Sequence, residues 1–283
     1  MSPVLRHRSD LTGSEVWEGD ARQVAAAMAP GSCSLAILDG AYGCGKSKVW
    51  DAVKITDLPE WYRPHLEDVD RVCGPSASLY LWNTAEGWAA VHPVILSMGW
   101  TFRALVVWDK KNTAASMAWK KTNRWPVTHE VCGYYVRGGP MFSATYPRSV
   151  WSLAVQGWAD ERVHTGVVRP GAKNQDGVSC MVSESLHPCQ KPILFAERMI
   201  RASTRPGEFV WAPFGGTLRE AVAAERIARA DPEEARRVIT AELNQDGVDY
   251  IGPALRQMQG LGTRRVDPRQ ALLFGAPAST GGA

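Results

Sequence analysis

The stretch Leu35-Ala-Ile-Leu-Asp-Gly-Ala-Tyr-Gly-Cys-Gly-Lys-Ser47 predicts the fold of the chain. Its apolar residues 35–38 stop at Asp39, and glycines follow at positions 40, 43 and 45. We therefore expect a buried strand that delivers an acid and the ring of Tyr42 to its carboxyl end, where open α/β sheets bind ligands. The segment Gly40–Ser47 also matches the phosphate loop G-x-x-x-x-G-K-[ST] at every fixed position, so nucleoside triphosphate hydrolysis is one candidate function.

Length and composition indicate one large globular domain. The 283 residues are enough for a full hydrophobic core, and a content of 45% hydrophobic and 22% charged residues is ordinary. The net charge of +3 is mild, so a nucleic-acid surface would have to come from local clusters of cations. The six cysteines show no C-x-x-C spacing, so we expect neither a metal site nor a disulfide framework. There is no signal-peptide pattern and no apolar run of membrane length, which predicts a cytoplasmic protein without membrane contact.

Strand and helix signals alternate along the chain. We expect strands at residues 16–20, 35–38, 78–82, 102–108, 131–136, 207–211 and 238–241. We expect helices at residues 21–28, 59–72, 85–98 and 193–202 and one that ends at 229, with 231–237 extending it or beginning another. This alternation predicts parallel βαβ units. Residues 1–15 are predicted to be loose and 261–283 to be a flexible tail, which leaves residues 16–260 as one domain.

Two segments of that domain, residues 110–128 and 137–185, lose this regularity and mix cations with aromatic residues. Phosphates need positive charge and unstacked bases need flat partners, so both segments suit a nucleic-acid surface. The alternative is that they are solvated loops whose aromatic residues belong to the core. The candidate DNA contacts are Lys110, Lys111, Trp119, Lys120, Lys121, Arg124, Arg148, Arg162 and Arg169.

Four blocks carry a resemblance to a known family. His187-Pro-Cys-Gln-Lys-Pro192 is similar to the H-P-x-Q-K-P block of the β-class amino DNA methyltransferases. Ala212-Pro-Phe-Gly-Gly216 resembles their cofactor loop D-P-F-x-G-x-G, and Asp39-Gly-Ala-Tyr42 resembles their catalytic tetrapeptide Asp-Pro-Pro-Tyr. Glu242-Leu-Asn244 resembles the strand end whose acid receives the ribose hydroxyls of S-adenosylmethionine. The tetrapeptide precedes the cofactor loop, as in the β class, and the resemblance covers roughly residues 16–258.

The resemblance implies a Rossmann-like methyltransferase fold of the α/β class, with a circularly permuted motif order, a mixed but mostly parallel sheet and inserted DNA-recognition loops. It implies methyl transfer from S-adenosylmethionine to an exocyclic amine in double-stranded DNA. It also makes a restriction endonuclease a candidate partner, although the sequence does not tell whether one exists. Aspartate at the first tetrapeptide position goes more often in this family with adenine N6, and serine goes with cytosine N4. The implied catalytic residues are Asp39, Gly40, Ala41 and Tyr42; the implied cofactor residues are Asp20, His187, Gln190, Lys191, Phe214, Gly215, Gly216, Thr217, Glu242 and Asn244.

The chemistry explains why these residue types would be needed. The adenine amine is a poor nucleophile because its lone pair is delocalised into the ring. Hydrogen bonds from the amine to the Asp39 carboxylate and the Gly40 carbonyl would favour a pyramidal nitrogen. Tyr42 would stack on the base after it is flipped from the duplex.

Four positions depart from the family pattern, and they leave alternatives open. Gly40 and Ala41 replace two prolines, Ala212 replaces the leading acid of the cofactor loop, and Leu218 replaces its last glycine. The alternatives are an N4-cytosine methyltransferase, a homologue that binds DNA without catalysis, and the nucleoside triphosphatase. The last would need Lys46 on the phosphates and Ser47 on Mg²⁺, and it leaves the other motifs unexplained.

One further motif lies in the tail. Gln270-Ala-Leu-Leu-Phe274 is similar to the peptide by which bacterial replication and repair proteins bind the sliding clamp. The alternative, which we favour, is that these apolar side chains fold back onto the protein's own surface.

Overall fold

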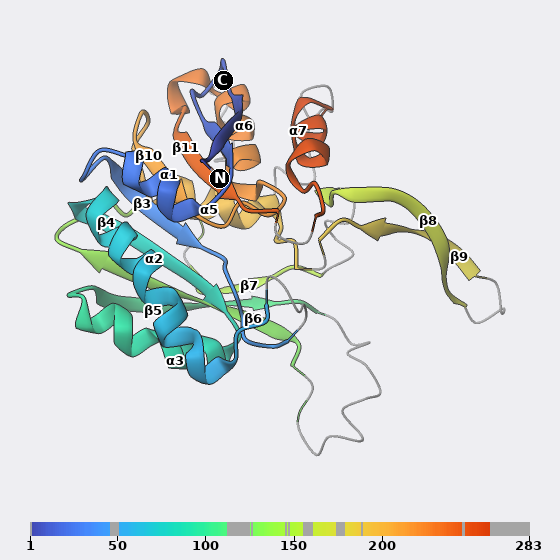
Figure 1. Cartoon of the computed structure of the whole chain (residues 1–283), viewed down its shortest axis with the longest axis horizontal. Helices are drawn as coiled ribbons and strands as arrows, with labels where there is room; N and C mark the ends of the chain where they lie inside the picture. The colour runs from blue at the N-terminus through green and yellow to red at the C-terminus, as the bar shows by residue number, and fades with distance from the viewer. Residues whose placement is uncertain are drawn as a thin grey trace, which may run out of the picture.

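The computed structural model of the chain describes residues 2–45, 51–111, 125, 127–144, 146, 148–154, 161–173, 179–187, 189–244 and 247–260. Within them, one sheet of nine strands has the order β1-β2-β11-β10-β3-β4-β6-β5-β7 (Figure 1). The strands are β1 Val4–Arg8, β2 Glu15–Glu18, β3 Cys33–Leu38, β4 Cys73–Asn83, β5 Thr101–Asp109, β6 His129–Arg137, β7 Val150–Ser152, β10 Phe209–Ala212 and β11 Arg237–Glu242.

The sheet is mixed and mostly parallel, as predicted. Strand β3 pairs in parallel with both β10 and β4, and β11 pairs in parallel with both β10 and β2. Strand β6 lies antiparallel between β4 and β5. The connection that leaves β3 leads to β4 on one side, whereas the connection from β10 leads to β11 on the other side. The carboxyl ends of β3 and β10 therefore flank the point at which the strand order reverses, which is where open α/β sheets bind ligands.

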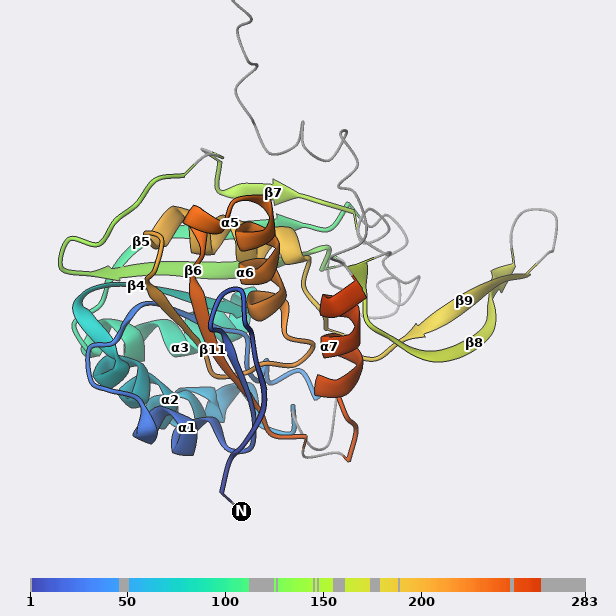
Figure 2. The same cartoon turned by 90° about the horizontal axis from the view of Figure 1, so that it is seen from above.

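Helices cover both faces of the sheet (Figures 1 and 2). On one face lie α1 Ala21–Ala27, α2 Leu58–Val72 and α3 Ala85–Ser97; on the other lie α5 Ile193–Ser203, α6 Arg219–Ala230 and α7 Ile251–Gly260. Strand β3 supplies both cores, because alternate side chains of a strand point to opposite faces. Leu35 and Ile37 pack with the second group of helices, and Ala36 and Leu38 pack with the first. None of the helices that the structure describes is long and apolar enough to cross a membrane.

The ends of the domain differ from the sequence prediction. Residues 1–15 were predicted to be loose, but β1 pairs antiparallel with β2 and forms one edge of the sheet, where Arg6 forms an ion pair with Glu18. An edge strand has few buried side chains, so its polar sequence carries no strand signal. Residues 231–237 do not extend α6, which ends at Ala230. Asp231 has an extended backbone with a φ of −154°, and Pro232 then begins a separate 3₁₀ turn, η3 Pro232–Glu234. The predicted tail, residues 261–283 with the motif Gln270–Phe274, lies outside the described residues.

The second irregular segment also contains more structure than predicted. Residues 137–185 include β7 and a separate two-stranded sheet, formed by β8 His164–Lys173 and β9 Ser179–Ser185. This hairpin projects from the body of the molecule (Figures 1 and 2). A hairpin that stands apart from the main core is under no demand for an apolar alternation, so the pattern that marks a half-buried strand is missing.

Candidate active site

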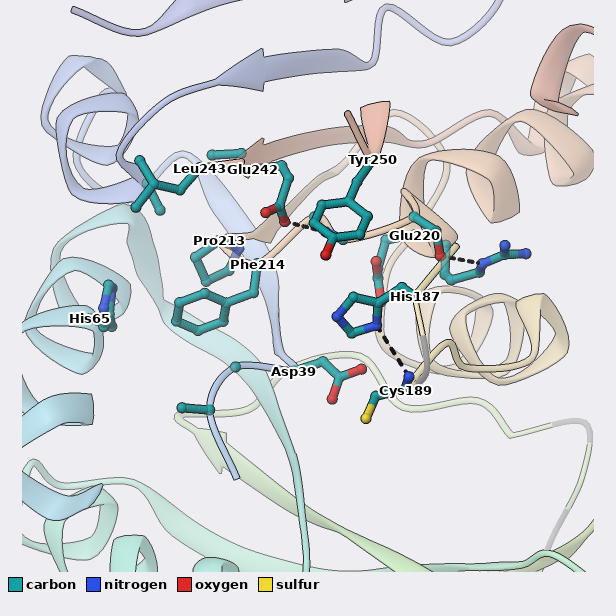
Figure 3. A pocket seen from close by; sticks show the side chains of 18 of the residues that line it. Asp39, His65, His187, Cys189, Pro213, Phe214, Glu220, Glu242, Leu243 and Tyr250 are labelled. Atoms are coloured by element: carbon teal, nitrogen blue, oxygen red, sulfur yellow. Dashed lines mark hydrogen bonds between the residues drawn. The ribbon is translucent and has the colours of Figure 1, made fainter. Parts of the chain in front are cut away.

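A cavity of about 330 Å³ lies at the carboxyl ends of β3, β10 and β11 (Figure 3). It brings together segments that are far apart in the sequence. With one exception, every predicted catalytic and cofactor residue lines it: Asp20, Asp39, Gly40, Ala41, Tyr42, His187, Gln190, Lys191, Phe214, Gly215, Gly216, Thr217 and Glu242. The exception is Asn244, whose side-chain amide donates a hydrogen bond to Glu18 at 3.0 Å, away from the cavity.

The loop after β3 is held by side chains from three other segments. The buried carboxylate of Asp51 accepts the N–H groups of Tyr42 at 2.8 Å and Gly43 at 2.7 Å. The Ala41 carbonyl accepts the Tyr62 hydroxyl at 3.0 Å and the Asn83 amide at 3.1 Å. The loop shape is thus fixed from outside, which compensates for the two prolines that the family pattern has and this chain lacks.

The same contacts argue against a phosphate loop. Such a loop cradles phosphates with its backbone N–H groups, but here two of those groups are already bound by Asp51. The carboxylate of Asp51 would in addition repel a phosphate. Lys46 and Ser47, on which the triphosphatase interpretation depends, lie outside the described residues.

Packing explains why glycine stands at position 40. A Cβ atom at Gly40 would lie 2.8 Å from Cε2 of Phe214 and 3.0 Å from the Tyr62 hydroxyl oxygen. Phe214 is part of the cofactor loop, so the two loops touch at this point. A proline, which the family pattern has here, would require the Phe214 ring to move.

A cluster of charges surrounds the end of β3. Lys191 Nζ donates to both oxygens of Asp39 at 3.0 Å each and to the Tyr42 hydroxyl at 2.8 Å. Lys191 also forms an ion pair with Glu130, at 3.1 Å, and the Tyr42 hydroxyl donates to Asp39 at 2.8 Å. Glu130, on β6, additionally binds Lys110. Lys191 was predicted to contact the cofactor, but its ammonium lies on Asp39, the predicted catalytic acid.

Burial makes these charges depend on one another. Burial raises the pKa of Glu130, but Lys191 and Lys110 outweigh it and lower that pKa to about 2 from an ordinary 4.5. Burial lowers the pKa of Lys191, but Asp39 and Glu130 outweigh it and hold that pKa above its usual range. Burial and the two carboxylates raise the pKa of Tyr42, so its hydroxyl stays protonated and donates. The Tyr42 ring is 5% exposed and belongs to the cavity wall.

The glycine loop after β10 is tied to the end of β11. Glu242 accepts the Gly216 N–H at 2.6 Å, and a Cβ atom at Gly215 would lie 3.0 Å from the Ala241 carbonyl oxygen. Gly215 therefore serves the contact with β11, whereas Gly216 has a φ of +48° with open space beside it.

Leu218 has a backbone conformation that glycine adopts more readily than leucine. Its φ is +59°, in the left-handed region, and its side chain is fully buried. The left-handed conformation costs a leucine about 1–2 kcal/mol. Burying the side chain stabilises the fold by about 1.5–3 kcal/mol, which is enough to offset that cost.

Aromatic side chains line the cavity beside the glycine loop. The Phe214 ring stacks on Trp61 at 5.4 Å between centroids and meets the His65 ring at 4.9 Å. On the opposite side, the His187 ring lies 5.3 Å from the Tyr250 ring, and His187 Nδ1 accepts the Cys189 N–H at 3.2 Å. The cavity therefore offers flat apolar surfaces as well as carboxylates.

Three predicted cofactor residues are largely occupied by structural contacts. Asp20 caps α1 by accepting the Arg22 N–H at 2.8 Å. Gln190 exchanges hydrogen bonds with the backbone of Val163, at 2.8 Å in both directions. Thr217 Oγ1 accepts from Arg219 Nε at 3.0 Å.

Sequence reasoning missed several residues of the site. Glu130 lies beside the predicted strand 131–136, and Asp51 lies shortly after the catalytic loop, but nothing local indicates their partners. Four others are on helices whose positions depend on the tertiary fold: Trp61 and His65 on α2, and Arg219 and Glu220 on α6. Tyr250 directly precedes α7.

The predicted DNA contacts are only partly described. Lys110 is 24% exposed at its side chain and bound to Glu130, so it belongs to the charge cluster rather than to an open surface. Lys111 forms an ion pair with Asp109 at 2.7 Å. Arg148 is exposed, and Arg162 is half-buried. Arg169 lies in β8, while Trp119, Lys120, Lys121 and Arg124 lie outside the described residues.

Comparisons with known proteins agree with this geometry. Residues 33–252 match a family model described as DNA methylase. The PvuII DNA methyltransferase (cytosine-N4-specific) is similar over 93% of this chain and 91% of its own, with 14% identity and a TM-score of 0.63. The M1.HpyAVI–SAM complex is similar over 86% and 98%, with 16% identity and a TM-score of 0.53. A putative DNA modification methylase from Thermus thermophilus, complexed with S-adenosyl-L-methionine, is similar over 86% and 95%, with the same identity of 16% and TM-score of 0.53. These likenesses confirm the predicted methyltransferase fold.

Proposed function

This chain belongs to the DNA methylase family, and we propose that it transfers a methyl group from S-adenosylmethionine to the N6 amine of adenine in DNA. The observation that carries the proposal is the position of Asp39, whose carboxylate stands at the carboxyl end of β3 in the same cavity as the glycine loop and Glu242. The same cavity thus holds a carboxylate that can accept a hydrogen bond from the base amine and the residues that would bind the cofactor.

Asp39 is held ready to accept a hydrogen bond. Its oxygens receive three hydrogen bonds from Lys191 and Tyr42, and its side chain is 21% exposed. A carboxylate offers about four acceptor positions, so one remains for an amine N–H from the cavity. Lys191 and Tyr42 fix the direction of the carboxylate, and we assign them as positioning residues. Asp39 and the Gly40 carbonyl would then orient the amine lone pair.

The residues of the cavity fit an adenosyl cofactor. Glu242 would accept the ribose hydroxyls with the acceptor positions that the N–H groups of Gly216 and Asn244 leave. The Phe214 ring, stacked on Trp61, would pack against the base. When bound, S-adenosylmethionine supplies a methyl group activated by a sulfonium. The protein excludes water around it with the aromatic walls and holds the two reactants in line, which in model systems contributes up to about 7–11 kcal/mol.

DNA would approach from the carboxyl edge of the sheet. The β8–β9 hairpin projects from the side at which β3 and β4 end (Figure 1). We propose that residues 110–128 and this hairpin carry the contacts to phosphates and the flipped base. We propose that the enzyme acts in the cytoplasm, on the DNA that it modifies. A restriction endonuclease partner, and clamp binding through Gln270–Phe274, stay predictions.

The direct test is incubation of the full chain with isotope-labelled S-adenosylmethionine and mixed-sequence DNA, followed by mass spectrometry of the nucleosides. We expect labelled N6-methyladenine. Labelled N4-methylcytosine would overturn the assignment of the base, and absence of any labelled nucleoside would overturn methyl transfer. Asp39→Ala is the matched control: it should abolish the label while cofactor affinity, measured by calorimetry, stays within about twofold.

A further inference from the structure

One acid of the cavity has no role in the geometry described so far. Glu220 lies in the first turn of α6, lines the cavity and is 7% exposed. Figure 3 shows it on the side of His187 and Tyr250. No side chain among the described residues donates a hydrogen bond to its carboxylate; its own backbone N–H does.

The charged neighbours of Glu220 do not neutralise it. Arg219, the adjacent residue, turns its guanidinium to Gln190, at 2.6 Å, and to the Glu161 carbonyl, at 2.6 Å. Lys191 is bound by Asp39 and Glu130. Burial is the main cause that raises the pKa of Glu220 to about 7; the charge of Asp39 adds to it, and Lys191 and Arg219 oppose it.

A buried carboxylate without a cationic partner is costly, unless a ligand brings the cation. The proposed cofactor does so, because its amino-acid end carries an ammonium and its reactive centre is a sulfonium. The family pattern has an acid at the start of the cofactor loop, but this chain has the buried Ala212 there. The chain thus lacks the carboxylate that the pattern has at the start of the glycine loop, and it has another carboxylate, Glu220, in the cavity on the helix that follows.

We propose that Glu220 binds the ammonium group of the amino-acid end of S-adenosylmethionine, in place of the acid that this chain lacks at position 212. The inference rests on the proposed function and concerns the recognition of the cofactor by this chain. A cation beside Glu220 favours its ionised form, so cofactor binding between about pH 5 and 7 releases a proton from the protein. Affinity therefore rises with pH up to about 7 and then levels off. Asp39, Lys191, Arg219, His187 and Tyr250 face the same space, so the proton must be assigned with a variant of Glu220 itself.

The test compares two ligands by calorimetry on the full chain. S-adenosylmethionine carries both cations, whereas methylthioadenosine keeps the adenosyl part and carries neither. We expect Glu220→Gln to weaken S-adenosylmethionine about 10- to 100-fold and to leave methylthioadenosine within about twofold. Titrations near pH 6, in buffers of different ionisation enthalpy, should show proton release for the wild type with S-adenosylmethionine and none for Glu220→Gln.

Two variants separate cofactor recognition from a structural role. Glu225→Gln removes another buried acid of α6, which is paired with Arg229 rather than facing the cavity, and should leave both affinities unchanged. Ala212→Asp, added to Glu220→Gln, should restore much of the affinity. Equal weakening of both ligands in Glu220→Gln, or wild-type affinity for S-adenosylmethionine, would overturn the inference while the function stands. If the wild type binds neither ligand, the proposed function falls as well.

Discussion

Replacing Lys191 by methionine tests how the charge cluster is held together. The Lys191 side chain lies between Asp39 and Glu130. It is 6% exposed, and the Glu130 side chain is 8% exposed. Methionine keeps the apolar length of the side chain and removes the cation. The two carboxylates then share one cation fewer, in a place that water hardly reaches.

The expected loss of stability follows from these partners. Removing one member of a buried ion pair costs about 3–5 kcal/mol, because the remaining charge is left without compensation. The pKa of Glu130 gives a second scale, since its fall from 4.5 to about 2 corresponds to a net stabilisation of about 3 kcal/mol by Lys191 and Lys110 after the cost of burial. We therefore expect Lys191→Met to lower the free energy of unfolding by about 3–5 kcal/mol at neutral pH.

The effect has a defined pH dependence. The lowered pKa of Glu130 contributes stability that is present above its ordinary 4.5 and is lost as the pH falls toward 2. The raised pKa of Lys191 contributes stability that is present below its ordinary 10.5 and is lost only at strongly alkaline pH. The difference between wild type and variant is thus largest between about pH 5 and 9 and shrinks below about pH 4.

Urea unfolding of both proteins, followed by tryptophan fluorescence at several pH values, measures this difference. Lys110→Met is the matched control, because Lys110 binds the same Glu130 but is 24% exposed, so its loss should cost less. Lys191→Arg keeps the charge and should retain part of the stability. A loss below about 1 kcal/mol at neutral pH, or one of equal size at about pH 3 and pH 7, would refute the reasoning.

Three other changes test separate parts of the site. Glu242→Ala should weaken S-adenosylmethionine binding in calorimetry, because up to two hydrogen bonds of about 1.5–3 kcal/mol each are removed; unchanged affinity would remove Glu242 from the ribose site. Asp51→Ala leaves two loop N–H groups without their acceptor, at about 1–3 kcal/mol each, so the urea midpoint and turnover should both fall, and an unchanged midpoint would contradict this. Joint replacement of Lys120, Lys121 and Arg124 by neutral residues should make the slope of log DNA affinity against log salt concentration shallower by about 0.9 for each phosphate contact that is lost. An unchanged slope would show that these three residues are plain surface charges.

Much of the fold could be predicted because its signals are local. An apolar run that ends in an acid and a glycine marks a strand of a parallel sheet, and Asp39 stands where that pattern puts it, directly after β3. The order of the motifs indicated the family, and the match over residues 33–252 confirms it. The edge strand β1 and the β8–β9 hairpin were missed, because strands outside the core carry no apolar alternation.

The sequence by itself also determined which residues gather at the site. Strand ends of a parallel sheet meet at one edge, so Asp39, the glycine loop and Glu242 had to be neighbours. Only the tertiary structure decided what these side chains do to one another. Lys191 reaches Asp39 across 152 residues of chain, and Glu130 reaches the same ammonium from an antiparallel strand. Such contacts depend on the packing of whole elements, and no local pattern encodes the distance between two side chains that the fold brings together.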